Sequence, residues 1–166
     1  AARMGETGAG HFVKTVHNGI EYADMQMIAE VYGVMRDGLG MGASAIGDVF
    51  ARWNEGVLNS YLTEISAAVA HATDPLTDRP MLDIILDRAG QKGTGRWTVI
   101  EAQHLGAPVS VIEAAVTARN MSAVLDARKA GEAVFGARTA SRPDLAIDAL
   151  EQALIAGKIL CYAQGF

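Results

Sequence analysis

GETGAGHFVKTVHNGIEY, residues 5–22, is the stretch that decides how this chain is interpreted. A helix turns by about 100° per residue, so side chains three and four positions apart share one face. Four polar side chains fall within an arc of roughly 100° on such a helix: Lys14, His17, Asn18 and Glu21. The same face then becomes apolar toward residue 35. We therefore predict a helix that buries one end of a face and carries titratable groups at the other, with plain solvent exposure of the first turns as the alternative.

The remaining sequence predicts an all-α fold, a multi-helix domain with one long N-terminal helix. Apolar residues recur at helical spacing, Ser44 and Asn54 suit helix N-caps, and Pro143 suits the first turn of the last helix. The predicted helices cover about residues 11–37, 44–53, 54–69, 81–88, 97–105, 110–129 and 143 to the end, with loops at 71–80 and 130–143. No strand pattern persists. We expect one domain over residues 1–166, with a Gly-rich linker at 1–10.

Composition narrows the function classes. Half of the 166 residues are hydrophobic, enough for a sizeable core. The net charge of −5 disfavours a nucleic-acid partner, whose binding needs a basic face, and no apolar run approaches the roughly 20 residues of a membrane span. The four histidines lack zinc-type spacing, so no metal is expected. Cys161, Trp53 and Trp97 fall in apolar helical stretches and are predicted to pack in the core.

A second cluster of interest is AGQKGTG, residues 89–95. Its glycines leave backbone N–H groups available to an anion, Lys92 adds a charge and Thr94 a hydroxyl, and the loop opens a helix whose N-terminus favours negative charge. A connecting turn with a solvated lysine is the alternative. Arg119 lies within an apolar helical stretch, where an unpaired charge is costly; it is either a structural ion-pair partner or a further anion ligand.

Gly19 conflicts with the helix predicted around it. Asn-Gly is a turn signal, and glycine inside a helix costs about 1 kcal/mol relative to alanine. The helical period persists on both sides, so we keep the helix. Two explanations remain open: a ligand approaches the backbone closely at Gly19, or another helix packs tightly against it.

Four motifs carry a family resemblance. The order G-x-x-G-x-G-x-x-x-K-x-x-x-N over residues 5–18 resembles the substrate motif of the β-hydroxyacid dehydrogenases. It is not a dinucleotide fingerprint, because position 13 is valine and no strand precedes it. Together with HNGIEY at 17–22, AGQKGTGRW at 89–97 and YAQGF at 162–166, the chain resembles the helical C-terminal domain of the 6-phosphogluconate dehydrogenase family.

The resemblance implies a function: oxidative decarboxylation of 6-phosphogluconate to ribulose 5-phosphate with NADP, a cytoplasmic step of the pentose phosphate pathway. It implies that Lys14 takes the proton of the C3 hydroxyl and that Glu21 protonates the enediol. The implied substrate contacts are His17 and Asn18 for orientation, and Tyr22, Lys92, Thr94 and Arg119 for the phosphate.

The resemblance also implies a homodimer and a chain longer than this one. The family's NADP-binding Rossmann domain and C-terminal tail are absent, so we expect this chain to be a fragment that is inactive alone. Two alternatives stay open. The first is a domain of another β-hydroxyacid dehydrogenase, which would not need Lys92, Thr94 and Arg119 together. The second is a structural helical oligomerisation module, which would not need Lys14, Asn18 and Glu21 on one face.

Overall fold

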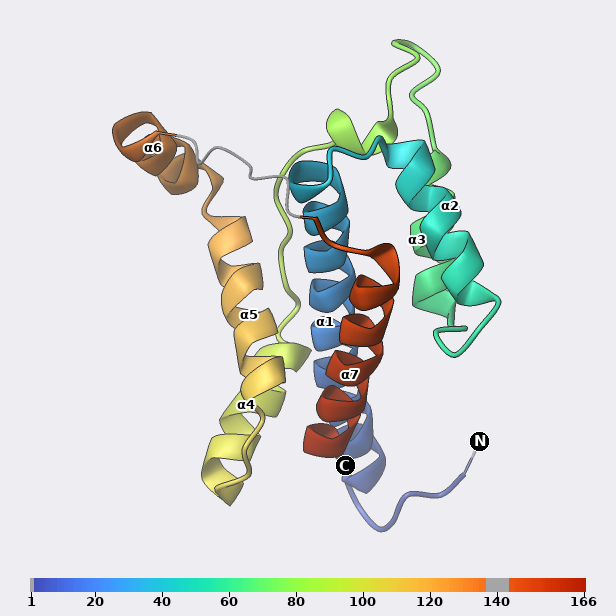
Figure 1. Ribbon diagram of the computed structural model, residues 1–166. Helices are drawn as coiled ribbons and strands as arrows, with labels where there is room; N and C mark the ends of the chain where they lie inside the picture. The colour runs from blue at the N-terminus through green and yellow to red at the C-terminus, as the bar shows by residue number, and fades with distance from the viewer. Residues whose placement is uncertain (1, 137–143) are drawn as a thin grey trace. The chain divides into compact units, whose positions relative to one another are not determined.

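The regular secondary structure of the described residues is helical. The computed structural model describes residues 2–136 and 144–166, and in these ranges the chain is all-α, as predicted (Figure 1). The helices are α1 Ala9–Gly33, α2 Ala43–Asn54, α3 Tyr61–His71, α4 Thr94–Leu105, α5 Ser110–Ala123, α6 Leu125–Phe135 and α7 Ile147–Gly165. Within the described ranges, β-pairing is limited to one isolated bridge between Thr73 and Pro80.

The long N-terminal helix lies where the sequence predicts it. Gly5 has a left-handed φ of 133°, which glycine adopts without strain, and α1 begins soon after, at Ala9. The helical backbone continues beyond Gly33 through a π-helical turn, Val34–Gly38. Gly40, with a φ of 70°, then redirects the chain. The glycines at this end therefore stop the helix, as the sequence suggests.

The chain divides into two compact units. The first contains the described residues up to Gln26, Arg88–Ala130 and Gly157–Phe166, and the second contains Met27–Asp87 and the described part of Gly131–Ala156. α1 and α7 each contribute residues to both units. The expectation of a single domain over residues 1–166 stays a prediction.

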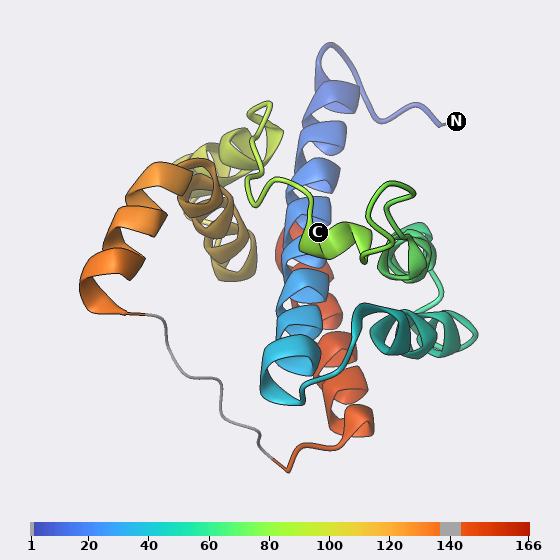
Figure 2. The same ribbon diagram turned by 90° about the horizontal axis from the view of Figure 1, so that it is seen from above.

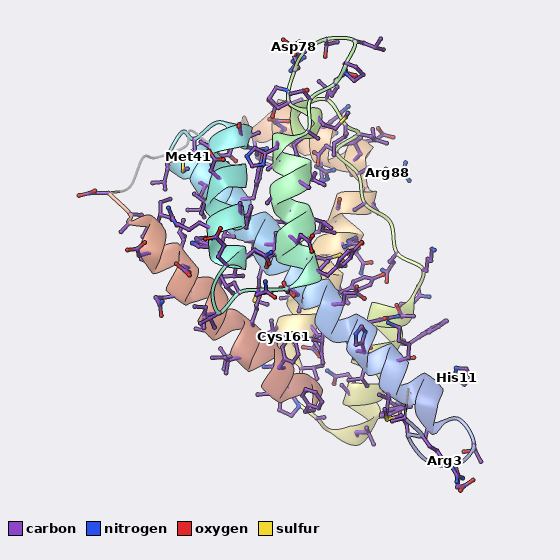
Figure 3. All side chains as sticks on the ribbon, turned by 90° about the vertical axis from the view of Figure 1, so that its right-hand side faces the viewer. Arg3, His11, Met41, Asp78, Arg88 and Cys161 are labelled. Carbon is purple, nitrogen blue, oxygen red and sulfur yellow. The ribbon has the colours of Figure 1, made fainter. Side chains whose placement is uncertain are left out.

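In the first unit, the last turns of α7 pack on the middle of α1, around residues 20–24. Lys158 Nζ donates to Asp24 Oδ2 at 2.9 Å and lies 2.8 Å from Oδ1, and both side chains are largely buried. Cys161, labelled on α7 in Figure 3, is fully buried and its thiol donates to the carbonyl of Ile20. Gly165 lies against the Ile20 side chain. The prediction that Cys161 packs in the interior is confirmed.

The second unit holds an apolar core. Figures 1 and 2 both show α2 and α3 side by side. The rings of Phe50 and Trp53, both almost fully buried, meet edge to face at 5.6 Å between centroids, a favoured aromatic geometry. The core combines buried residues of α1, α2, α3 and α7 with Met35 of the π-helical turn and Leu58 of the turn before α3: Ile28, Val31, Met35, Ile46, Val49, Phe50, Trp53, Leu58, Ala67, Leu150 and Leu154. The core prediction for Trp53 is confirmed.

Two predicted helix caps are wrong. α2 begins at Ala43 after Gly42, which caps without a side-chain hydrogen bond, so Ser44 lies inside the helix. Asn54 ends α2 rather than opening the next helix. Its Oδ1 accepts from the backbone N–H of Ser60, and Ser60 is the N-cap of α3, its Oγ accepting from Thr63 N at 3.2 Å. The Asn54 side chain thus stabilises the turn between α2 and α3, and the Ser60 side chain caps α3.

The long helix predicted over residues 110–129 is broken. α5 ends at Ala123 and α6 starts at Leu125, because Val124 departs from helical geometry (ψ 54°). The guanidinium of Arg128 donates to the carbonyls of Met121 and Ser122 at 3.1 Å each, which satisfies acceptors at the break.

The remaining boundaries also need correction. The loop predicted over 130–143 is helical up to Phe135, whereas 137–143, with Pro143, lie outside the described residues; α7 begins at Ile147. The helix predicted over 81–88 is only a 3₁₀ turn, Met81–Asp83. α4 starts at Thr94, three residues early.

Trp97 is half exposed, against the prediction that it lies in the core. The buried residues of α4 are the small ones, Gly95, Thr98 and Ala102. This helix therefore approaches its neighbours closely through small side chains and leaves its large apolar residues outside.

Candidate functional site

The first turns of α1 bring three of the predicted polar residues into contact. Lys14 Nζ lies 3.0 Å from His17 Nδ1, and His17 Nδ1 lies 3.4 Å from Asn18 Oδ1. If Nδ1 of His17 accepts from Lys14, it carries no proton, and its contact with the amide oxygen Asn18 Oδ1 is then a close approach of two acceptors and not a hydrogen bond. Lys14 and His17 are exposed, whereas Asn18 is half-buried. The three residues form a polar chain leading from solvent toward the protein.

The glycine-rich segment at 89–93 forms a loop that ends at α4. Gly93, directly before the helix, has a left-handed φ of 111°, which a residue with a Cβ would adopt only under strain. Thr94 is the first helical residue and Lys92 is exposed beside it. The N–H groups of the first turn of a helix have no intrahelical partner and attract anions. The loop thus presents a cation and a hydroxyl at a helix N-terminus, as predicted.

α5 holds this loop at three consecutive residues. The backbone N–H of Ala89 donates to Ser122 Oγ at 2.9 Å. The next carbonyl, that of Gly90, accepts from Arg119 at 3.0 Å, and the side-chain amide of Gln91 donates to Asn120 Oδ1. The position of the loop is therefore fixed by a helix that follows it in sequence.

Arg119 also contacts α1. Its guanidinium carbon lies 4.8 Å from the centroid of the Tyr22 ring, within cation–π range. The same ring packs directly on Gly95 of α4, where a methyl carbon would lie 2.8 Å from Tyr22 Cδ1. Arg119 is partly exposed, and no carboxylate pairs with it among residues 2–136 and 144–166: in this part of the chain it is a stacked arginine with a backbone acceptor and not a member of a salt bridge.

These elements enclose an open groove of about 500 Å³ within the first unit. Its lining residues are Asn18, Glu21, Tyr22, Gly90, Gln91, Lys92, Thr94 and Arg119. Six of the eight predicted site residues therefore line one groove. The other two, Lys14 and His17, do not line it, but lie one helical turn from Asn18 and Glu21 and are connected to Asn18 through the contacts above.

Gln91 is the lining side chain that the sequence prediction missed. Its Oε1 is buried without a hydrogen-bond partner among the described residues, while its Nε2 bonds Asn120. The signal was present in the quoted motif, since Gln91 lies between two of its glycines. Its role as a loop anchor depends on Asn120, 29 positions later, which no local pattern indicates.

The structure decides between the two explanations for Gly19. A Cβ at Gly19 would lie 2.6 Å from Cγ2 of Thr98 on α4, and Thr98 is buried. The space beside Gly19 is therefore filled by a neighbouring helix. Tight helix packing is therefore sufficient to explain the glycine at this position.

The groove is mixed in charge, with the cations of Lys92 and Arg119 and the carboxylate of Glu21. This arrangement suits a ligand with an anionic group at one end and hydroxyl groups at the other. Among residues 2–136 and 144–166, no group of three or more potential ligands could hold a metal ion. None of the described helices combines the length and apolarity that crossing a bilayer requires.

Comparison with known proteins identifies relatives over nearly the whole chain. The family model described as "6-phosphogluconate dehydrogenase, C-terminal domain" matches residues 10–166. The decarboxylating 6-phosphogluconate dehydrogenase of Bacillus licheniformis is 49% identical over 98% of this chain and 36% of the relative. The NAD(+)-dependent enzyme of Bacillus subtilis is 44% identical, again over 98% of this chain and 36% of the relative.

A solved structure agrees. The 6-phosphogluconate dehydrogenase of Plasmodium falciparum, described in its apo form, with its cofactor NADP+ and with its substrate 6-phosphogluconate, superposes with a TM-score of 0.93 at 41% identity. The match covers 99% of this chain and 36% of that one. This chain thus spans about a third of the length of the relatives it matches.

Proposed function

The chain belongs to the family of 6-phosphogluconate dehydrogenase C-terminal domains, and on this premise we propose that it is the substrate-binding part of an oxidative decarboxylase that converts 6-phosphogluconate to ribulose 5-phosphate. The observation that carries the proposal is the groove that combines Asn18 and Glu21 with Lys92, Thr94 and Arg119. A phosphorylated sugar acid has an anionic end and a row of hydroxyls, which these two sets of groups complement.

In this proposal the phosphate binds at the loop and α4. Lys92 supplies a point charge, Thr94 supplies a hydroxyl at the start of α4, and Arg119 supplies the donors of its guanidinium that Gly90 leaves unused. Tyr22 donates its phenolic hydroxyl to the same group. A non-phosphorylated β-hydroxyacid would leave these donors unmatched, which disfavours the alternative dehydrogenase. A purely structural module would not need the polar groove.

The reacting end of the sugar lies along α1. Lys14 takes the proton of the C3 hydroxyl as C3 is oxidised to a ketone; an amine that donates an N–H to His17 Nδ1 keeps its lone pair for that proton. The C1–C2 bond then breaks, C1 leaves as carbon dioxide, and Glu21 protonates the former C2 of the resulting enediol, which becomes C1 of ribulose 5-phosphate. Asn18 and His17 orient the hydroxyls. Each of these roles follows from the family resemblance and agrees with the chemistry of the side chains.

We propose NADP as the cofactor; its chemistry is to accept the hydride from C3. The described groove offers the size and donors for a sugar phosphate, and its lining contains no cradle for a dinucleotide. We therefore propose that NADP is bound mainly by residues outside the third of the full-size relatives that this chain matches. NAD is the other choice, since a relative with that dependence is 44% identical. We place the reaction in the cytoplasm, as the resemblance implies.

We also propose a homodimer. Several large apolar side chains of the first unit are about half exposed or more, and patches of this kind mark association surfaces: Phe12, Trp97, Ile159, Leu160, Tyr162 and Phe166. Light scattering at micromolar concentration should give about twice the 17.5 kDa of the chain. A monodisperse monomer would contradict this part of the proposal.

Calorimetry on the chain tests the substrate. We expect 6-phosphogluconate to bind at least about tenfold more tightly than gluconate, because charge-assisted hydrogen bonds to the phosphate contribute about 1.5–3 kcal/mol. Arg119→Ala should remove this preference, whereas Arg52→Ala, an exposed arginine of the second unit, should keep it. Equal affinity for the two ligands would refute the proposed substrate.

Turnover requires a complete enzyme, and a chimera provides one. This chain would replace the matching third of the Bacillus licheniformis relative. We expect the chimera to oxidise 6-phosphogluconate, and Lys14→Met to reduce kcat by about 10²–10⁴-fold, the usual contribution of a general base. Unchanged kcat in the Lys14→Met chimera would refute the role of Lys14.

A further inference from the structure

Thr98 is a buried hydroxyl that joins two helices beneath the groove. Its side chain is 4% exposed. Oγ1 donates to the carbonyl of Thr15 on α1 at 2.8 Å and lies 3.0 Å from the carbonyl of Thr94 on its own helix. A hydroxyl has a single proton to donate, so the two carbonyls share it. The bond to Thr15 connects residues 83 positions apart.

The fit at this crossing depends on a glycine. Any Cβ at Gly19 would lie within 2.6–2.8 Å of three atoms of Thr98, closer than side-chain atoms approach. In an α-helix the Thr15 carbonyl also accepts from the N–H of residue 19. Thr98 therefore occupies the space that Gly19 leaves and bonds the carbonyl to which Gly19 itself is bonded. Because of both contacts, the two helices have little freedom to slide.

The two carbonyls belong to two helices, α1 and α4, that each contribute residues to the groove. Thr15 lies one turn before Asn18 on α1, whose face carries Asn18 and Glu21 into the groove. Thr94 is itself a lining residue at the start of α4, next to the Lys92 loop. Thr98 does not line the groove. It touches the backbone that presents each end.

We propose that Thr98 is a positioning residue that sets the spacing between the hydroxyl-binding end of the groove (Asn18, Glu21) and its phosphate-binding end (Lys92, Thr94). This inference rests on the function proposed above. A ligand that reaches both ends depends on the spacing, whereas a ligand that occupies the phosphate end alone does not. The ratio of the two affinities therefore reports the spacing and is insensitive to a general loss of stability.

The test is a titration of the isotope-labelled chain followed by NMR, with inorganic phosphate and 6-phosphogluconate as the two probes. Thr98→Val removes the hydroxyl and keeps the shape of the side chain. It should weaken 6-phosphogluconate binding about fivefold, because an altered spacing misaligns about one hydrogen bond between the groove and this ligand, and it should leave phosphate binding within about twofold. Thr98→Ser keeps the hydroxyl and should match the unsubstituted chain with both probes.

Thr63→Val is the matched control. Thr63 is fully buried in the second unit, where its Oγ1 lies 2.9 Å from Ser60 Oγ. The Thr63→Val variant should be less stable to unfolding, while the ratio of its affinities for 6-phosphogluconate and phosphate should stay unchanged. If 6-phosphogluconate binds the unsubstituted chain no more tightly than phosphate, the proposed substrate is wrong and the role of Thr98 falls with it. Suppose instead that 6-phosphogluconate binds more tightly than phosphate. Then only the positioning role is wrong if Thr98→Val leaves the ratio of the two affinities unchanged, or if Thr98→Ser lowers it.

Discussion

Each compact unit contains a glycine that admits a polar side chain from a neighbouring helix, and the two contacts differ in depth. In the first unit, Gly19 admits Thr98, which is buried and bonds two backbone carbonyls. In the second, Gly47 of α2 admits the imidazole of His71 of α3, which bonds the Ala67 carbonyl and, at 2.9 Å, the exposed Asp48.

One polar pair in each unit repeats this difference in burial. Asp24 and Lys158 of the first unit have side chains 9% and 14% exposed, whereas Asp48 and His71 of the second are 78% and 40% exposed. Burial makes a polar contact costly to break, because the remaining partner loses both water and its counterpart. Substitutions at the polar contacts of the first unit should therefore lower the free energy of unfolding strongly, and those at the polar contacts of the second unit only slightly.

The largest effect is expected at the buried ion pair. Lys158→Met leaves the Asp24 carboxylate buried without its partner and should lower the free energy of unfolding by about 3 kcal/mol. Asp48→Asn, at the exposed pair, should change it by less than about 1 kcal/mol. Urea unfolding at pH 7 measures both. The double variant Asp24→Leu/Lys158→Met should recover most of the loss, since no unpaired charge remains; equal effects at the two pairs would contradict the comparison.

The second largest difference is expected between alanine substitutions at the two glycines, Gly19 and Gly47. Gly19→Ala places a methyl 2.6 Å from the buried Thr98 and should cost about 2 kcal/mol through overpacking. Gly47→Ala meets the far end of an exposed histidine, which can rotate away. Its cost should be offset by the higher helix propensity of alanine, about 1 kcal/mol. Thermal unfolding of both variants measures the two costs. A larger loss of stability in Gly47→Ala than in Gly19→Ala would contradict the prediction.

A smaller effect concerns pH. Burial, with a contribution from the nearby Asp24, raises the pKa of the Cys161 thiol to about 11. The folded state thus favours the neutral thiol, whereas an unfolded thiol ionises near pH 8.5. The stabilisation from Cys161 is complete below about pH 8.5 and is lost as the pH rises toward 11.

Cys161→Ala isolates this contribution from those of lysine and tyrosine. We expect the free energy of unfolding of the unsubstituted chain to fall more steeply between about pH 9 and 11 than that of the variant. Parallel curves would mean that the thiol does not contribute. A thiol reagent at pH 8 should react with Cys161 only when the chain unfolds, because the folded thiol is neutral and buried.

How far the sequence could predict this molecule depends on the range of the interaction concerned. α1 follows from a local apolar period and terminal glycines, so it was predicted nearly to the residue. The start of α3 was not, because Asn54 and Ser60 are both good caps and the choice depends on a hydrogen bond between them. The break at Val124 was missed because Arg128, which satisfies the exposed carbonyls, resembles any charged residue near a helix end.

The groove shows the same limit. Lys92 and Thr94 stand out in a short motif, and Arg119 stands out as a charge in an apolar stretch. The anchoring of Gln91 by Asn120, and the filling of the space beside Gly19 by Thr98, join residues 29 and about 80 positions apart. Neither could be derived without the three-dimensional structure.

The loop held by α5 has a consequence for protein engineering. Ala89, Gly90 and Gln91 each use a different residue of α5, namely Ser122, Arg119 and Asn120. Deleting or inserting one loop residue would misalign all three bonds together, so this loop should not vary in length as surface loops usually do. The loop and that stretch of α5 form one exchangeable module: a graft into another scaffold, or a swap between homologues, should transfer residues 89–93 and 119–122 together.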